Sequence, residues 1–273
     1  MLKDALATAA LAALTLLAAS AASAASGAPS LYGLDPEAKG LAIAEEADRR
    51  DDGFGDSRAK LTMVLRNAHG ETSTRELRNR TLEQVDDGDK SVVIFDHPRD
   101  VKGTAFLTFS HIDGDDDQWL YLPALKRVKR ISSSNKSGPF MGSEFAYEDI
   151  SSQEVAEYTY RYLRDEEIRG QESYVVERIP THPKSGYQRQ EVWFDRAELR
   201  PLKTVFYDRK GDLLKTLEQL DFELHLDRYW RPAKMTMVNH QTGKSTELQW
   251  SDYAFRNGFT ESDFDRASLA RAR

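Results

Sequence analysis

Alternation of apolar and polar residues with a period of two runs through most of this 273-residue sequence and constrains its fold more than any other feature. It is first clear after Ser57, where Ala59, Leu61, Met63 and Leu65 alternate with mostly charged or polar neighbours. The pattern is typical of a half-buried β-strand, because successive side chains of a strand point to opposite faces of its sheet. The same alternation predicts further strands at 71–83, 90–96, 103–110, 117–123, 125–131, 157–168, 172–180, 188–195, 202–208, 213–226, 232–239 and 244–254.

Short turns separate these segments. The stretches 86–89, 113–115, 209–212 and 241–244 combine Gly with Asp or other polar residues, as hairpin turns do. No repeated helical segments lie between the strands, as a parallel α/β fold would require. The length allows one large β domain or two small ones. We predict a mainly β protein with a few helices, built on one large curved antiparallel sheet in a single domain, 35–273.

The sequence predicts one helix before the first strand. Asp35 is placed to cap it, Pro36 suits the first helical position, and Leu41, Ala44 and Ala47 fall on one face. The following Asp/Gly stretch predicts its end.

The N-terminal residues have the features of a secretory signal peptide. Lys3 supplies a charge, an apolar run covers 5–19, and Ala-Ser-Ala at 22–24 offers a small-residue cleavage site. The run is too short to anchor the chain well in a membrane, and no twin arginine precedes it. We predict a cleaved signal peptide at 1–24, a flexible leader at 25–34 and a periplasmic protein. The sequence has no cysteine, which excludes disulfides and an N-terminal lipid anchor.

Composition and motifs argue against several classes of function. A net charge of −7 without a basic tail makes nucleic-acid binding a poor fit. The six histidines are scattered, and no nucleophile elbow, phosphate loop or dinucleotide fingerprint occurs. The acidic run at 111–117 lacks the spacing of a calcium loop and fits a solvated turn better. We therefore expect no enzyme activity, no metal and no cofactor, and the sequence gives no reason to expect more than a monomer.

The stretch 119–150 interrupts the alternation. It begins as an apolar strand, becomes strongly basic, and then breaks into a Ser/Gly/Pro segment within 132–153. Loops are normally polar, yet this one carries four large apolar side chains, Phe140, Met141, Phe145 and Tyr147. Two interpretations stay open: a mobile lid whose side chains fill a cavity until a ligand displaces them, or a fixed loop that completes the core.

Candidate ligand contacts follow from the lid interpretation. Aromatic side chains on the strands could line the interior of a curled sheet, although a filled core is the simpler explanation for any one of them. The predicted contacts are Phe106, Trp119, Tyr121, Phe140, Met141, Phe145, Tyr147 and Trp193. Four cations between them, Lys126, Arg127, Lys129 and Arg130, either form an electrostatic rim for headgroups or an acidic partner, or protect an edge strand from aggregation.

Several segments together resemble the outer-membrane lipoprotein-sorting family, a LolA-like group of exported bacterial proteins. The similar segments cover roughly 40–270. They are WLYLPAL at 119–125, the basic run 126–131, FMGS at 140–143, YED at 147–149, EVWFD at 191–195, PL at 201–202, YD at 207–208 with Gly211, LKT at 214–216, Trp230 with Pro232, and the ending from FRNG at 255–258 through Phe264. No position can be assigned here to the strand arginine that holds the lid of the lipoprotein carrier shut.

The resemblance implies an unclosed antiparallel half-barrel of about eleven strands, with helices that plug its concave side as a lid. It also implies binding of acyl chains of lipids or lipoproteins for transfer toward the outer membrane, with transient membrane contact and an inner-membrane lipid transporter as a partner. A sensor that binds lipid or lipoprotein and signals to a membrane protein is the alternative function.

Overall fold

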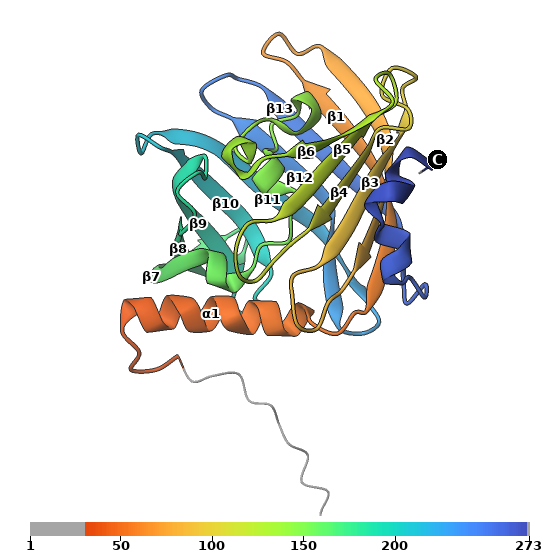
Figure 1. The fold of residues 1–273 in the computed structure, drawn as a ribbon. Helices are drawn as coiled ribbons and strands as arrows, with labels where there is room; N and C mark the ends of the chain where they lie inside the picture. Colours follow the sequence, from red (N-terminus) through yellow and green to blue (C-terminus); the bar gives the residue numbers. More distant parts are fainter. Residues whose placement is uncertain (1–30, 272–273) are drawn as a thin grey trace, which may run out of the picture.

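Thirteen antiparallel strands form a single sheet in the computed structural model, which describes residues 31–271 (Figure 1). The predicted signal peptide and most of the predicted leader lie outside these residues. Every strand predicted from the alternation overlaps an observed one. The count of about eleven strands implied by the family resemblance was too low, since thirteen are observed. The strands are β1 (Asp56–Arg66), β2 (Thr72–Leu82), β3 (Lys90–His97), β4 (Ala105–Phe109), β5 (Asp117–Leu122), β6 (Arg127–Ile131), β7 (Tyr158–Ile168), β8 (Gln171–Pro180), β9 (Tyr187–Asp195), β10 (Pro201–Asp208), β11 (Leu213–His225), β12 (Tyr229–Asn239) and β13 (Ser245–Phe255).

The sheet consists of two meanders, the first formed by β1 to β6 and the second by β7 to β13. Its order is β6-β5-β4-β3-β2-β1-β13-β12-β11-β10-β9-β8-β7. Pairing of β1 with β13 joins the meanders, with Met63 opposite Leu248 and Leu61 opposite Trp250. The edge strands β6 and β7 do not pair with each other, so the curled sheet stays open on one side (Figure 1).

The chain between the two edge strands crosses the concave side of the sheet. This stretch, residues 132–157, is called the plug segment below. It contains four short 3₁₀ turns, η1 (Ser133–Asn135), η2 (Phe140–Gly142), η3 (Tyr147–Asp149) and η4 (Val155–Glu157). The helical plug implied by the resemblance is therefore a chain of single turns, which Gly and Pro residues favour over a continuous helix.

One α-helix, α1 (Pro36–Asp51), lies across one end of the half-barrel (Figure 1). The predicted cap is confirmed, since Asp35 Oδ1 accepts a hydrogen bond from the Ala38 N–H at 2.8 Å. Leu41 was wrongly placed on the buried face and is exposed, whereas Ile43 is fully buried against Val176 and Val192. At Gly40 the helix approaches β7 so closely that a Cβ would lie 2.7 Å from the Tyr162 backbone nitrogen.

The C-terminal residues cover the convex face. Two 3₁₀ turns, η5 (Glu261–Phe264) and η6 (Arg266–Arg271), place Phe264 and Leu269 against Ile94, Leu107 and Trp119. Asp56 anchors the connection because its carboxylate accepts the N–H groups of residues 257, 258 and 259. Those hydrogen bonds outweigh burial and lower the pKa of Asp56.

Candidate functional site

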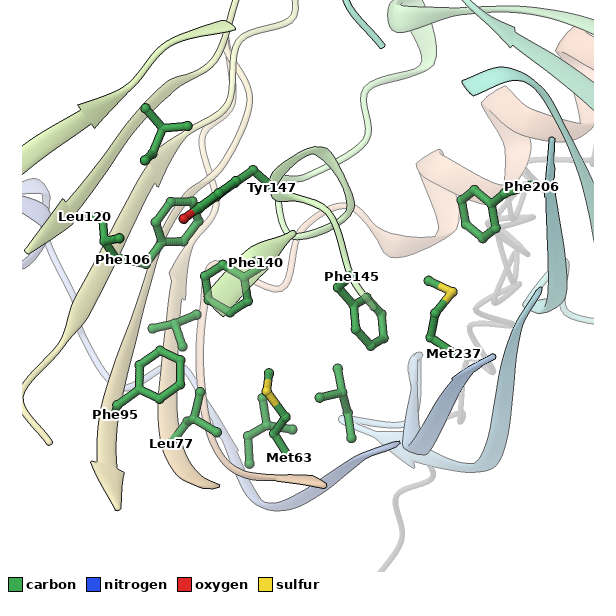
Figure 2. Packing of buried hydrophobic residues seen from close by; sticks show 14 of the residues in the cluster. Met63, Leu77, Phe95, Phe106, Leu120, Phe140, Phe145, Tyr147, Phe206 and Met237 are labelled. Carbon is green, nitrogen blue, oxygen red and sulfur yellow. The ribbon is translucent and has the colours of Figure 1, made fainter. Parts of the chain in front are cut away.

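The apolar side chains of the plug segment point into the concave face. Phe140, Phe145 and Tyr147 are 1%, 3% and 8% exposed and belong to the main core cluster. Figure 2 shows Phe140 beside Phe95 and Phe106 of the first meander, while Phe145 lies toward Met237 of the second. The plug segment thus links the inner faces of both meanders.

Aromatic contacts hold this arrangement. The ring of Phe106 lies 5.1 Å from that of Phe140 and 5.4 Å from that of Tyr147, between centroids. Met141 is only partly buried, and its positive φ of 50° turns the chain sharply before Gly142. The four predicted contact residues of the plug segment therefore lie together with Phe106 of β4.

Three predicted contacts lie elsewhere. Trp119 packs in the convex cluster beneath the C-terminal turns, and Tyr121 packs against the same cluster. Trp193 is buried with Val175 and Val205 in a separate cluster. The register explains this, since Trp193 pairs with Lys203 and so lies on the face opposite to Phe206, which is in the main core. A ligand in the concavity would not touch these three side chains, so they are removed from the candidate site.

A buried ion pair fixes the plug segment to the second meander. Lys215 Nζ on β11 lies 2.7 Å from Asp149 Oδ2, and both side chains are nearly inaccessible, at 5% and 4%. Asp149 also accepts hydrogen bonds from the Tyr187 hydroxyl at 2.8 Å and from the Ala146 N–H at 2.6 Å. Lys215 Nζ donates as well to the Glu144 carbonyl at 3.0 Å. With these partners the two buried charges are well compensated.

Further polar contacts hold the rest of the segment. Arg75 Nη1 on β2 donates to the Met141 carbonyl at 2.5 Å. On the β12 and β13 side, Asn239 donates to the Glu144 carboxylate at 2.7 Å, and the Glu144 N–H donates to the Thr246 hydroxyl at 3.0 Å. Polar contacts to β2, β11, β12 and β13 therefore surround the apolar plug.

These polar anchors were not predicted from the sequence, although one signal was present. Lys215 lies on the same strand face as Leu217, which packs against the main core cluster. The side chain of this lysine therefore points toward the concave interior. A lysine there must find a buried partner. Asp149 could not be identified as that partner, because the plug segment has no periodicity that fixes the direction of its side chains.

Next to the plugged region lies an open cavity of about 860 Å³ between α1 and the lower concave face. Its apolar walls come from Phe54, Phe194, Leu199, Phe222, Trp230, Pro232, Met235 and Trp250. Residues 153 and 155 of the plug segment also line it. Met235 and Trp250 pack against the main core cluster as well, so the cavity borders directly on the space that the plug fills.

The four predicted rim cations lie at the free edge of the sheet. Lys126 is in the turn before β6, and Arg127, Lys129 and Arg130 are on that strand, all of them exposed. Arg130 pairs with Asp117 of the neighbouring strand. The position fits both interpretations, a charged rim and a protected edge strand.

Within residues 31–271, no group of three or more His, Asp or Glu side chains is placed to hold a metal ion. The acidic turn after β4 instead contacts histidine rings, with His111 Nδ1 at 2.7 Å from Asp87 and His182 Nε2 at 2.7 Å from Asp115. In the same part of the chain, no helix is long and apolar enough to cross a membrane.

Known proteins share this architecture. A protein-family model described as "-like: Uncharacterized protein" matches residues 87–271. A Vibrio parahaemolyticus domain named for outer membrane lipoprotein sorting is 59% identical, with 86% of this chain and 100% of that chain covered and a TM-score of 0.85. No curated protein matches the chain.

Two further solved structures are similar over nearly the same region. A DUF1329 family protein from Desulfovibrio piger is 30% identical, with 86% of this chain and 100% of that chain covered and a TM-score of 0.82. A LolA superfamily protein from Nitrosomonas europaea is 23% identical, with 84% and 98% covered and a TM-score of 0.67, and so shares the fold. The identity to the Vibrio domain over its whole length shows that this chain belongs to the same family, that of outer membrane lipoprotein-sorting protein domains.

Proposed function

We propose that this protein is a periplasmic carrier that binds acyl chains of lipids or lipoproteins in its concavity and transfers them toward the outer membrane. The observation that carries the proposal is the adjacency of an open cavity of about 860 Å³ and a plugged apolar space. Small-molecule sites commonly have volumes of about 300–1,000 Å³. Withdrawal of the plug would extend this cavity along the inner face of the sheet.

Burial of the plug side chains offsets a large part, but not all, of what burial of one acyl chain contributes. Burial of Phe140, Phe145 and Tyr147 contributes about 1.5–3 kcal/mol for each side chain. Enclosure of one sixteen-carbon chain contributes about 12 kcal/mol at about 0.8 kcal/mol for each methylene. Three fully enclosed chains would exceed the practical limit of about 20 kcal/mol for non-covalent binding and would not be released. Competition between plug and cargo for one apolar surface keeps binding reversible.

A disulfide that locks the plug tests this mechanism. Glu144 and Thr246 are chosen because a hydrogen bond of 3.0 Å from the Glu144 N–H to the Thr246 hydroxyl brings the plug segment and β13 into direct contact. The chain has no cysteine, so Glu144→Cys/Thr246→Cys can form only one disulfide. We expect the oxidised protein to stop transferring a fluorescent hexadecanoyl lipid between phospholipid vesicles, and reduction to restore transfer.

The matched control joins two strands and leaves the plug free. Val64 and Thr74 are direct partners in the β1–β2 pair, so Val64→Cys/Thr74→Cys places the disulfide within the sheet. This variant should transfer lipid in both redox states. Full transfer by the oxidised Glu144/Thr246 variant would show that the plug is fixed core and would overturn the mobile-lid mechanism.

The sensor function predicts a different bound state. Native mass spectrometry of protein isolated from the periplasm of the producing cell should show bound acyl species for a carrier. An empty protein in a stable complex with a membrane protein would favour the sensor.

A further inference from the structure

One arginine of the open cavity has most of its donors uncommitted. Arg200 follows the β9–β10 turn and lines the cavity, with its side chain 15% exposed. Its Nε donates to Asp195 Oδ2 at 2.7 Å. Among the residues that the structure describes, none accepts a hydrogen bond from its Nη1 or Nη2 atoms, which leaves about four of the five guanidinium N–H groups without a protein partner.

The guanidinium is nevertheless held in place. Its central carbon lies 4.5 Å from the ring centroid of Trp230 and 5.0 Å from that of Phe222, so both rings can make cation–π contacts. Asp195 is nearly fully buried and also accepts the N–H groups of residues 197, 198 and 200. With its acceptors engaged in this way, Asp195 acts as an anchor for the arginine.

The other cavity arginines differ in this respect. Arg231 pairs with Asp51, and Arg178 donates from two nitrogens to Gln190 and Gln153. Arg50 donates to Glu46 and to the Ala197 carbonyl, Arg49 donates twice to Glu46, and Arg228 donates to the Arg49 carbonyl. Arg200 is thus the cation of the cavity lining whose two terminal nitrogens both lack a partner within the described residues. The carboxylates in the lining are Asp48, Asp51, Asp89, Glu198 and Asp227.

An apolar path begins beside this charge. Trp230, Pro232 and Met235 of β12 line the cavity in succession, followed across the sheet by Trp250. Met235 and Trp250 then reach the main core cluster that contains Phe140 and Phe145. The cavity lining therefore contains a fixed cation and also borders on the core cluster that the plug completes.

We propose that Arg200 binds the anionic end of an amphiphile, a carboxylate or a phosphate, whose acyl chain runs along β12 toward the plug. The proposal rests on the carrier function above and adds the charge of the cargo. A guanidinium can donate two parallel hydrogen bonds to either anion, and such charge-assisted bonds are among the stronger ones in proteins.

Binding of three single-chain probes tests the site. Sodium hexadecanoate, hexadecyl phosphate and methyl hexadecanoate share the chain, but only the first two carry an anion. We expect the intact protein to bind both anions at least 10-fold more tightly than the ester, as followed by tryptophan fluorescence and calorimetry at pH 8. In Arg200→Gln the affinity for the anions should fall about 10- to 100-fold while the ester is unaffected. The tighter of the two anions identifies the headgroup class.

Two variants separate binding from folding. Arg80→Gln removes an arginine that lies over Phe259 of the C-terminal stretch and should bind all three probes like the wild type. If Arg200→Gln unfolds because Asp195 loses its counter-charge, Arg200→Gln/Asp195→Asn removes both charges and should fold with the same loss of anion affinity.

The outcomes distinguish this inference from the carrier function. If Arg200→Gln binds each of the three probes as tightly as the wild type does, the anion site is overturned and the carrier function is left intact. Failure of the wild type to bind any of them would contradict the carrier function itself.

Discussion

A buried lysine at residue 215 illustrates how single side chains decide whether the plug stays in place. Two charges are removed from water when Lys215 and Asp149 pair, and that desolvation is offset only while both partners are present. Tyr187 and Ala146 complete the hydrogen bonds of the carboxylate. Because Asp149 belongs to the plug segment and Lys215 to the sheet, loss of either charge acts on the contact between them.

Removal of one partner should therefore be costly. We expect Lys215→Ala to lower the free energy of unfolding by about 3–5 kcal/mol, because Asp149 is left as an uncompensated buried charge. The change is measured by urea denaturation. Lys60→Ala is the matched control, since Lys60 and Asp252 are 68% and 64% exposed and solvent screens such a pair so strongly that its loss should hardly change stability. A cost for Lys215→Ala no larger than that of the control would show that the pair does not anchor the plug.

At the scale of elements, strands were predictable and the plug was not. Leu61 and Met63 alternate with polar residues, and this pattern identifies the buried face of β1, because strand geometry fixes side-chain direction. The plug segment has no such period. Phe140 and Phe145 could be recognised as apolar, but their burial depends on strands that are far away in the sequence.

The same limit explains the errors in the candidate site. An aromatic residue on a strand was assigned to the concave face without knowledge of which face curls inward. Trp119 and its neighbour Leu120 necessarily point to opposite faces, and it is Leu120 that belongs to the concave cluster. The face was decided by the curvature of the whole sheet and by the C-terminal turns, which cover Trp119.

The docking of α1 depends on one small residue. A Cβ at Gly40 would meet Tyr162 and Arg161 backbone atoms at 2.7–2.8 Å, and backbone cannot move aside cheaply. We expect Gly40→Ala to raise the amide hydrogen-exchange rates of α1, even though alanine favours the helical state itself. Exchange in β2 and β3 serves as the internal reference and should not change. Unchanged protection of α1 would mean that the helix shifts without loss of contact.

At the scale of the whole molecule, an open sheet needs other elements to close it. The plug segment occupies the upper concavity, α1 covers the lower end, and the C-terminal turns protect part of the convex face (Figure 1). The cavity arises where these parts leave space, with a lining drawn from residues 44 to 253. No local sequence pattern could have predicted the volume of this cavity. The volume depends on how strongly the whole sheet curves and on how much of the enclosed space the plug segment and α1 occupy.

Acidic residues around this lower end link stability to pH. Burial, reinforced by neighbouring carboxylates, raises the pKa of Asp89 to about 7 and that of Glu157 to about 7. Their pKa values in the unfolded chain are about 4. Between these values the folded protein binds more protons than the unfolded chain does, so the free energy of unfolding falls as pH rises. The stabilisation is fully present below pH about 4 and is lost above pH about 7.

Neutral replacements should remove this dependence. We expect Asp89→Asn/Glu157→Gln to be more stable than the wild type at pH 8 by roughly 1–3 kcal/mol and to show a flatter profile between pH 4.5 and 8. Urea denaturation across this range measures both, with Asp113→Asn at an exposed turn position as the control that keeps the wild-type slope. A double variant that is no more stable at pH 8 would show that the two carboxylates reach solvent in the folded protein, and that the end of the half-barrel beside α1 is wetter than its packing indicates.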